Sequence, residues 1–196
     1  MHDPGDLPAG LRGVATRLHL SGLAGRHESP GPVGGYMLIT SAITIGLLCG
    51  FALVTHLPFV FPSLGPSTFL IYYAATKATS SPRNIFCSHL IGTVSGYAAL
   101  VVFGLTDRPA DLEDVSWQRL GAVTLALCAT LTLMVLLGVP HAPAAATTLI
   151  VALGLLRTPW QLVVLMLAVC LLIVIGFAIN RFARLDYPLW APRLRD

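Results

Sequence analysis

Apolar residues fill four long runs of the chain, at about 36–57, 85–105, 119–139 and 160–182. A helix rises ~1.5 Å per residue, so each run is close to the ~20 residues that a membrane-spanning helix needs. Aromatic residues lie near the ends of the runs, where they are found at membrane interfaces: Tyr36, Trp117, Trp160, Tyr187 and Trp190. The pattern therefore predicts an all-α membrane protein.

Two shorter apolar stretches, 58–78 and 141–157, lie between these runs and are interrupted by prolines. Proline is tolerated in the first turn of a helix, which predicts irregular chain over 58–65 and 140–142 and helices that begin at Pro66 and Pro143, within two residues. The roughly fourteen apolar residues that follow each proline reach only ~21 Å, less than the ~30 Å hydrocarbon layer. Each short helix is thus expected to begin inside the membrane.

The order of long, short and long segments occurs twice. A shift of 77 residues places Pro66 on Pro143 and Pro82 on Pro159. A repeat with an odd number of crossings enters the membrane the other way up the second time, as in many secondary transporters. We expect two inverted three-segment repeats, 36–105 and 119–182, related by a pseudo-two-fold axis in the membrane plane. Each repeat has a short broken helix between two full transmembrane helices.

The domain organisation follows from the same pattern: a tail over 1–34, a membrane domain over 35–182 and a C-terminal tail over 183–196. Apolar residues at helical spacing around 11–18 are typical of a short interfacial helix, and a mobile tail is the alternative.

Charge predicts the orientation in the membrane. If both short segments complete a crossing, six spans place nine Lys and Arg on the side of the termini (Arg12, Arg17, Arg26, Lys77, Arg83, Arg181, Arg184, Arg193 and Arg195) and three on the other (Arg108, Arg119 and Arg157). If both short segments are re-entrant, four spans give the same nine against three. The positive-inside rule then predicts cytoplasmic termini, in a bacterial plasma membrane, and the inverted repeat favours six spans.

Composition supports the membrane class, since 55% of the residues are hydrophobic and 11% are charged. The net charge of +3 is small and gives no reason to expect a nucleic-acid partner. The four cysteines form no CxxC pair, and patterns such as HExxH and GxSxG are absent. We therefore expect no metal, no cofactor and no enzyme activity.

The starts of the two short helices are the candidate binding site, because free N–H groups and the positive end of the helix dipole attract anions. Ser67 and Thr68 follow the first start, His141 precedes the second, and Thr147 and Thr148 follow it. No acidic residue lies within an apolar run, which favours an anion or a neutral solute over a cation. We expect these five residues to converge on one cavity near the midplane. The alternative is that both starts serve only to pack helices.

His89 lies on the third segment beside the pattern Gly92-x-x-x-Gly96. A polar residue within a membrane segment is a candidate for solute binding, and a packed histidine bonded across helices is the alternative. Small residues allow close helix packing and suit a symmetric assembly. A homodimer is expected, with a trimer as the alternative.

The stretch "PSLGPSTFLIYYAATKATSSPRNIFCSHLIG", from Pro62 to Gly92, resembles the signature of the HPP family of small integral membrane proteins. "HAPAAATTL", from His141, resembles the His-Pro-Pro motif of that family, although Ala142 replaces the middle proline. The similarity covers about 36–181. Family members in chloroplasts and cyanobacteria are associated with nitrite transport. The resemblance therefore implies a transporter or channel for a small monovalent anion, with nitrite as the leading solute. A non-transporting membrane scaffold is the alternative.

Overall fold

The computed structural model describes residues 30–192, and all regular structure among them is helical. The elements are α3 (Pro30–Thr55), α4 (Leu64–Tyr73), η2 (Ala78–Ser80), α5 (Pro82–Val102), α6 (Trp117–Leu136), α7 (Ala144–Ala152) and α8 (Pro159–Phe182). The four long helices match the four apolar runs to within a few residues, except that α3 begins at Pro30. Residues 30–34, assigned to the N-terminal tail from the sequence, are thus helical and continuous with α3. The interfacial helix predicted around 11–18 lies outside the described residues.

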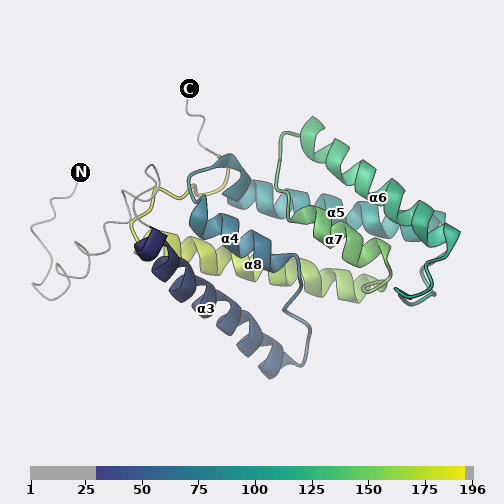
Figure 1. Cartoon of the computed structure of the whole chain (residues 1–196), viewed down its shortest axis with the longest axis horizontal. Helices are drawn as coiled ribbons and strands as arrows, with labels where there is room; N and C mark the ends of the chain where they lie inside the picture. Colours follow the sequence, from purple (N-terminus) through teal and green to yellow (C-terminus); the bar gives the residue numbers. More distant parts are fainter. Residues whose placement is uncertain (1–29, 193–196) are drawn as a thin grey trace, which may run out of the picture.

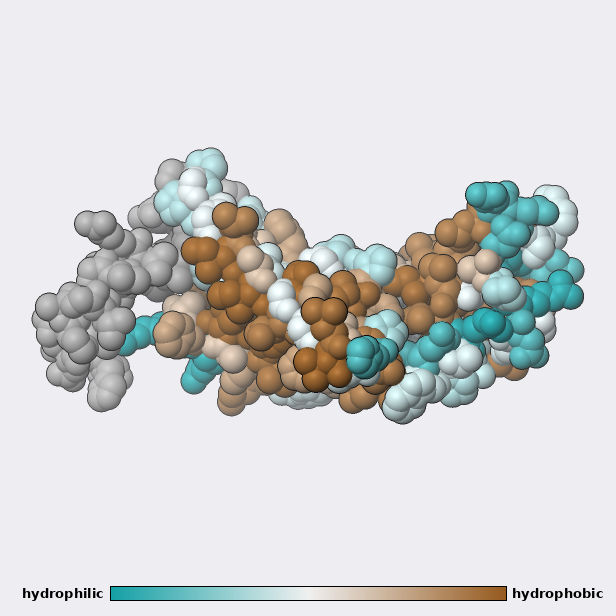
Figure 2. Space-filling model, turned by 90° about the horizontal axis from the view of Figure 1, so that it is seen from below, coloured by the Kyte–Doolittle hydropathy of each residue, from teal (hydrophilic) through white to brown (hydrophobic). Residues whose placement is uncertain are grey.

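Helices α3, α5, α6 and α8 are each long and apolar enough to cross a membrane. Large apolar side chains are exposed along them, among them Leu38, Val54, Val102, Val135 and Phe182. Figure 2 shows hydrophobic residues over much of the visible face and a hydrophilic region at one end. So much exposed apolar surface needs an apolar solvent. The predicted all-α membrane protein is therefore confirmed at this level.

The two short helices begin close to the predicted residues, α4 at Leu64 and α7 at Ala144, after non-helical chain. The alignment of the two short helices by a shift of 77 residues, which pairs Pro66 with Pro143, is however wrong. Pro66 is the third residue of α4, whereas Pro143 precedes α7 as its N-cap. The first N–H groups of a helix have no intrahelical acceptor, so proline fits at any of these positions and does not fix the alignment of the two helices.

The short helices end inside the protein, where their last carbonyl groups need donors from other elements. At the end of α4, Ser80 Oγ donates to Leu70 O at 2.8 Å and Asn180 Nδ2 donates to Ile71 O at 3.0 Å. At the end of α7, Arg119 Nη1 donates to Ala152 O at 3.3 Å. These bonds stabilise two helices that are too short to cross the membrane alone.

We expect Arg119→Met to lower the free energy of unfolding by about 1.5–3 kcal/mol, the range for a hydrogen bond to a charged group. Arg119 is buried and also donates to Arg108 O at 2.9 Å and Pro109 O at 3.1 Å. The measurement is thermal or denaturant unfolding in detergent. Arg108→Met is the matched control, because the exposed Arg108 takes part only through its backbone carbonyl. Equal stability of the two variants would contradict the prediction.

The helices run in alternating directions along the long axis of the molecule (Figure 1). Helix α5 packs against α6, α7 and α8, while α8 packs against α3 and α4. A Cβ atom at Gly92 would lie 2.8 Å from Ala144 O, and one at Gly96 would lie 2.8 Å from Cβ of Val151. The glycine pair thus forms a close contact between α5 and α7 within the chain.

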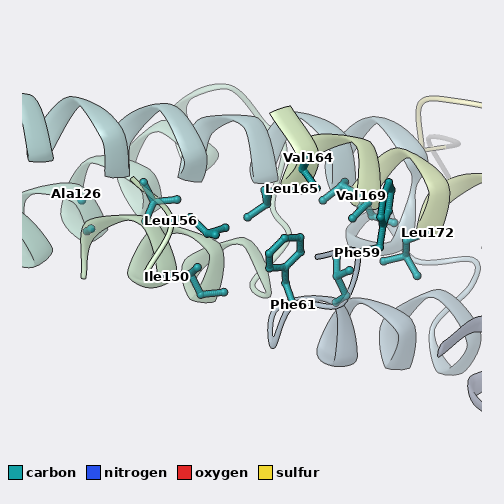
Figure 3. Close-up of a cluster of buried hydrophobic side chains, with 14 of the residues drawn as sticks. Phe59, Phe61, Ala126, Ile150, Leu156, Val164, Leu165, Val169 and Leu172 are labelled. Carbon is teal, nitrogen blue, oxygen red and sulfur yellow. The ribbon is translucent and has the colours of Figure 1, made fainter. Parts of the chain in front are cut away.

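The core lies between the two halves and holds the start of α4 in place. Phe59 and Phe61 in the α3–α4 connection are buried with Leu165 and Leu172 of α8 (Figure 3). Ile150 of α7 belongs to the same cluster. The aromatic side chains thus anchor the connection to α8, while Pro58, Val60 and Pro62 between them are exposed.

Candidate functional site

All six candidate binding residues are buried, with exposed fractions of 0–2%. They come from three helices and one connection: Ser67 and Thr68 from α4, His89 from α5, His141 from the chain before α7, and Thr147 and Thr148 from α7. The starts of α4 and α7 therefore meet inside the protein. None of the six side chains is open to the surface of the protein.

Four of these residues are joined by direct hydrogen bonds. Ser67 Oγ lies 2.9 Å from His141 Nε2 and 3.1 Å from His89 Nε2. His89 Nδ1 lies 2.7 Å from Thr147 Oγ1, and His141 Nδ1 lies 2.7 Å from Thr79 O. The two imidazole rings have centroids 5.2 Å apart. We call Ser67, His89, His141 and Thr147 the histidine cluster.

The donor and acceptor roles in the cluster follow from Thr79 O, which can only accept. His141 Nδ1 therefore donates to Thr79 O, and in a neutral ring Nε2 then accepts the Ser67 hydroxyl proton. Ser67 Oγ in turn accepts from His89 Nε2, and His89 Nδ1 accepts from the Thr147 hydroxyl. Every bond in the chain then has one proton, and all four ring nitrogens are occupied.

The structure does not place every predicted group in this cluster. Thr68 Oγ1 donates to Leu64 O at 2.7 Å, and Thr148 Oγ1 lies 2.9 Å from Thr130 Oγ1. The expectation of free N–H groups at the start of α7 is wrong, because the N–H groups of residues 144–146 bond to the carbonyls of residues 141–143. These hydrogen bonds between residues i and i+3 form a turn that leads into α7, and they occupy the N–H donors that an anion would need.

Ser63 is the residue that the sequence analysis missed. It is fully buried at the N-cap position of α4, and its side chain makes no cap hydrogen bond. Among the described residues, Ser63 Oγ is the one buried side-chain oxygen or nitrogen atom without a hydrogen-bond partner. Serine is common at N-caps, so the signal was present in the sequence, but it was hidden by placing the helix start at Pro66.

The backbone that accepts from His141 is held by the segment after α8. Tyr187 Oη donates to Ser80 O at 2.6 Å, and Arg83 N donates to Trp190 O at 3.0 Å. Burial raises the pKa of Tyr187, which keeps its hydroxyl protonated and able to donate. These bonds fix η2, and with it the carbonyl of Thr79.

The residues Pro82-Arg83-Asn84 position the start of α5. Arg83 Nη2 donates to Gly138 O at 2.9 Å, at the end of α6. Asn84 Nδ2 donates to Ala78 O at 2.9 Å in η2. Further along α5, the Ser88 hydroxyl donates to Val139 O. This face of α5 thus holds the connection that carries His141.

The comparison with known families agrees with this arrangement. The family described as "HPP, transmembrane region" matches residues 33–188, which include every helix from α4 to α8 and nearly all of α3. No curated protein and no solved structure matches the chain. Because the match covers most of the sequence, the chain belongs to the HPP family of membrane proteins.

Proposed function

We propose that this protein is a transporter or channel for a small monovalent anion, with nitrite as the leading solute, and that the anion binds at the start of α4. The observation that carries the proposal is the Ser63 hydroxyl, which is fully buried and has no partner. A buried hydroxyl without a partner costs about 1–3 kcal/mol, so such a group needs an explanation. An anion that accepts its proton supplies one.

The surroundings of Ser63 favour a weakly held anion. The N-terminal end of a helix behaves like roughly half a positive charge, and α4 has ten residues, although Leu64 N there donates to Phe61 O and Pro66 has no N–H group. No Asp or Glu lies in any helix from α3 to α8, so no carboxylate there competes with the solute. The dipole end and the hydroxyl attract an anion without a lysine or arginine at the site. A transported ion must also leave, and binding by neutral donors allows that.

The proposal includes the inverted repeat, which three observations support. Each helix of α3, α4 and α5 runs opposite to its counterpart in α6, α7 and α8 (Figure 1). The packed helix pairs are unchanged when the two halves are exchanged, since α5 on α7 corresponds to α8 on α4. A Cβ atom at Gly176 would lie 2.7 Å from Ile71, and one at Gly96 would lie 2.8 Å from Val151.

These contacts support one register for the proposed repeat. One shift of 80 residues takes Gly96 to Gly176 and Ile71 to Val151. The same shift takes Ser67 to Thr147, so His89 lies between two equivalent hydroxyls. The start of α3 and the end of α8 lie at the same end of the molecule (Figure 1). Because α3 and α5 run in the same direction, as do α6 and α8 (Figure 1), the helix directions support six crossings with both termini on one side, which the distribution of Lys and Arg assigns to the cytoplasm.

The test of the proposed function is anion binding and flux with purified protein. We expect nitrite to raise the unfolding temperature in detergent by an amount that grows with the logarithm of its concentration. Nitrate, chloride and formate are compared with sulfate at equal ionic strength. We further expect nitrite flux into proteoliposomes above the leak of protein-free vesicles. Identical unfolding curves in all salts, together with no flux of any anion, would indicate a membrane scaffold instead.

A further inference from the structure

We infer that the histidine cluster takes up one proton with each anion, so that the protein moves the two together without net charge. The inference rests on the proposed function, and it adds the coupling ion. It is carried by the contacts around Ser67 Oγ, which has three partners: His141 Nε2 at 2.9 Å, Ser63 O at 3.0 Å and His89 Nε2 at 3.1 Å.

A neutral cluster cannot use all three contacts at once. Ser67 has a single proton, and it can donate to His141 Nε2 or to Ser63 O. When His141 is neutral, its one ring proton is on Nδ1, which donates to Thr79 O. His141 Nε2 then has no proton to donate, so one of the two contacts is left without a hydrogen.

One added proton completes the network. When a proton from water binds to His141 Nε2, that nitrogen donates to Ser67 Oγ, which also accepts from His89 Nε2. The Ser67 proton then turns to Ser63 O, and every contact is used. Only the hydroxyl rotates, and no heavy atom has to move. On release the proton leaves His141 Nε2 and the hydroxyl turns back.

Within helices α3 to α8, the charge of this state has no carboxylate partner. A buried charge is costly unless an opposite charge accompanies it. Neither α4, η2 nor α7 contains a charged residue. The charged residues of the other packed helices are basic: Arg83 in the first turn of α5, Arg119 in the first turn of α6 and Arg181 in the last turn of α8. Apart from His89, which belongs to the cluster, the remaining titratable groups of these elements are Tyr72, Tyr73, Cys87, Tyr97, Cys128 and Cys170, which are neutral when protonated.

An anion at the start of α4 supplies the missing negative charge. Ser63 begins the turn that carries Ser67, and Ser67 Oγ contacts both Ser63 O and His141 Nε2, so the turn connects the proposed anion site with the protonated ring. Each ion lowers the cost of burying the other, and binding of the two is therefore coupled. An arginine or lysine at the site would bind the anion alone, whereas a histidine releases its charge with the proton.

The first experiment measures proton uptake on anion binding in weakly buffered detergent solution with a pH indicator. Nitrate and nitrite serve as probes, and sulfate serves as the blank. We expect about one proton per bound anion. His141→Gln keeps an amide that can hydrogen-bond but cannot be charged, and its uptake is expected to fall to about zero. His56→Gln is the matched control, because His56 is an exposed histidine outside the cluster. Anion binding without proton uptake, or full uptake by His141→Gln, would overturn the inference.

The second experiment separates this inference from the proposed function. In proteoliposomes, anion entry should be driven by a pH gradient that is acidic outside, and should not respond to an imposed membrane potential. Flux that follows the potential and carries no proton would overturn the coupling and leave the anion transporter standing. Absence of flux for every anion under every gradient would overturn the proposed function, and the coupling with it. The leak of protein-free vesicles is subtracted, because nitrous acid crosses lipid by itself.

Discussion

Ser63→Ala should stabilise the anion-free protein and weaken anion binding at the same time. Removing a buried hydroxyl that has no partner is expected to raise the free energy of unfolding by about 1–3 kcal/mol. Ser63 has a helical backbone conformation, with φ −68° and ψ −21°, which alanine adopts without strain. If the hydroxyl donates to the anion, its loss should weaken binding by about 1.5–3 kcal/mol, at least tenfold in affinity. Unfolding in detergent with and without nitrite measures both effects.

The variant is decisive because the free energy of unfolding should rise while the anion affinity falls. A hydroxyl that only packs would change stability and leave affinity as it was. A hydroxyl that supports the fold through a bond would lower stability when it is removed. Ser41→Ala on α3 is the matched control, since Ser41 is a partly buried serine far from the start of α4 in the chain. A Ser63→Ala protein with unchanged nitrite affinity would place the anion elsewhere.

Gly92→Ala should disrupt the contact between α5 and α7 and abolish flux. The new Cβ atom would lie 2.8 Å from Ala144 O and 2.8 Å from Thr148 Oγ1, both in α7. The backbone of α7 has to move to make room, and overpacking of this kind costs about 1–3 kcal/mol. Because His141 and Thr147 lie beside this contact, the shift should also separate them from Ser67 and His89.

The control for Gly92→Ala is Gly46→Ala on α3. A Cβ atom at Gly46 would meet nothing within 4 Å, so the same change adds a methyl group without a clash. Helix propensity alone favours alanine over glycine by up to about 1 kcal/mol, and Gly46→Ala should be neutral or slightly stabilising. Thermal unfolding and proteoliposome flux of the two variants give the comparison. Equal stability and equal flux of the two variants would contradict the prediction, because they would mean that α7 can shift at this contact without loss of free energy.

The membrane-spanning helices could be predicted because the signal is local. A run of about twenty apolar residues has few alternatives to a spanning helix, whatever surrounds it. The breaks before α4 and α7 were also local, since proline disfavours a helix interior. The residue-by-residue alignment of α4 with α7 was not determined locally, because proline fits at several positions of the first turn of a helix. Only packing distinguishes Pro66 within α4 from Pro143 before α7.

The sequence by itself determined the classes of groups at the site: hydroxyls at two short helix starts, a histidine before one of them and no acid within the helices. The tertiary structure alone decided which of them meet. His89 contacts Thr147 because α5 packs against α7, its side chain also reaches Ser67 on α4, and Ser63 is left without a partner where α4 begins. Hydrogen bonds between such distant residues depend on helix rotation and crossing, which the apolar pattern of a membrane helix does not specify.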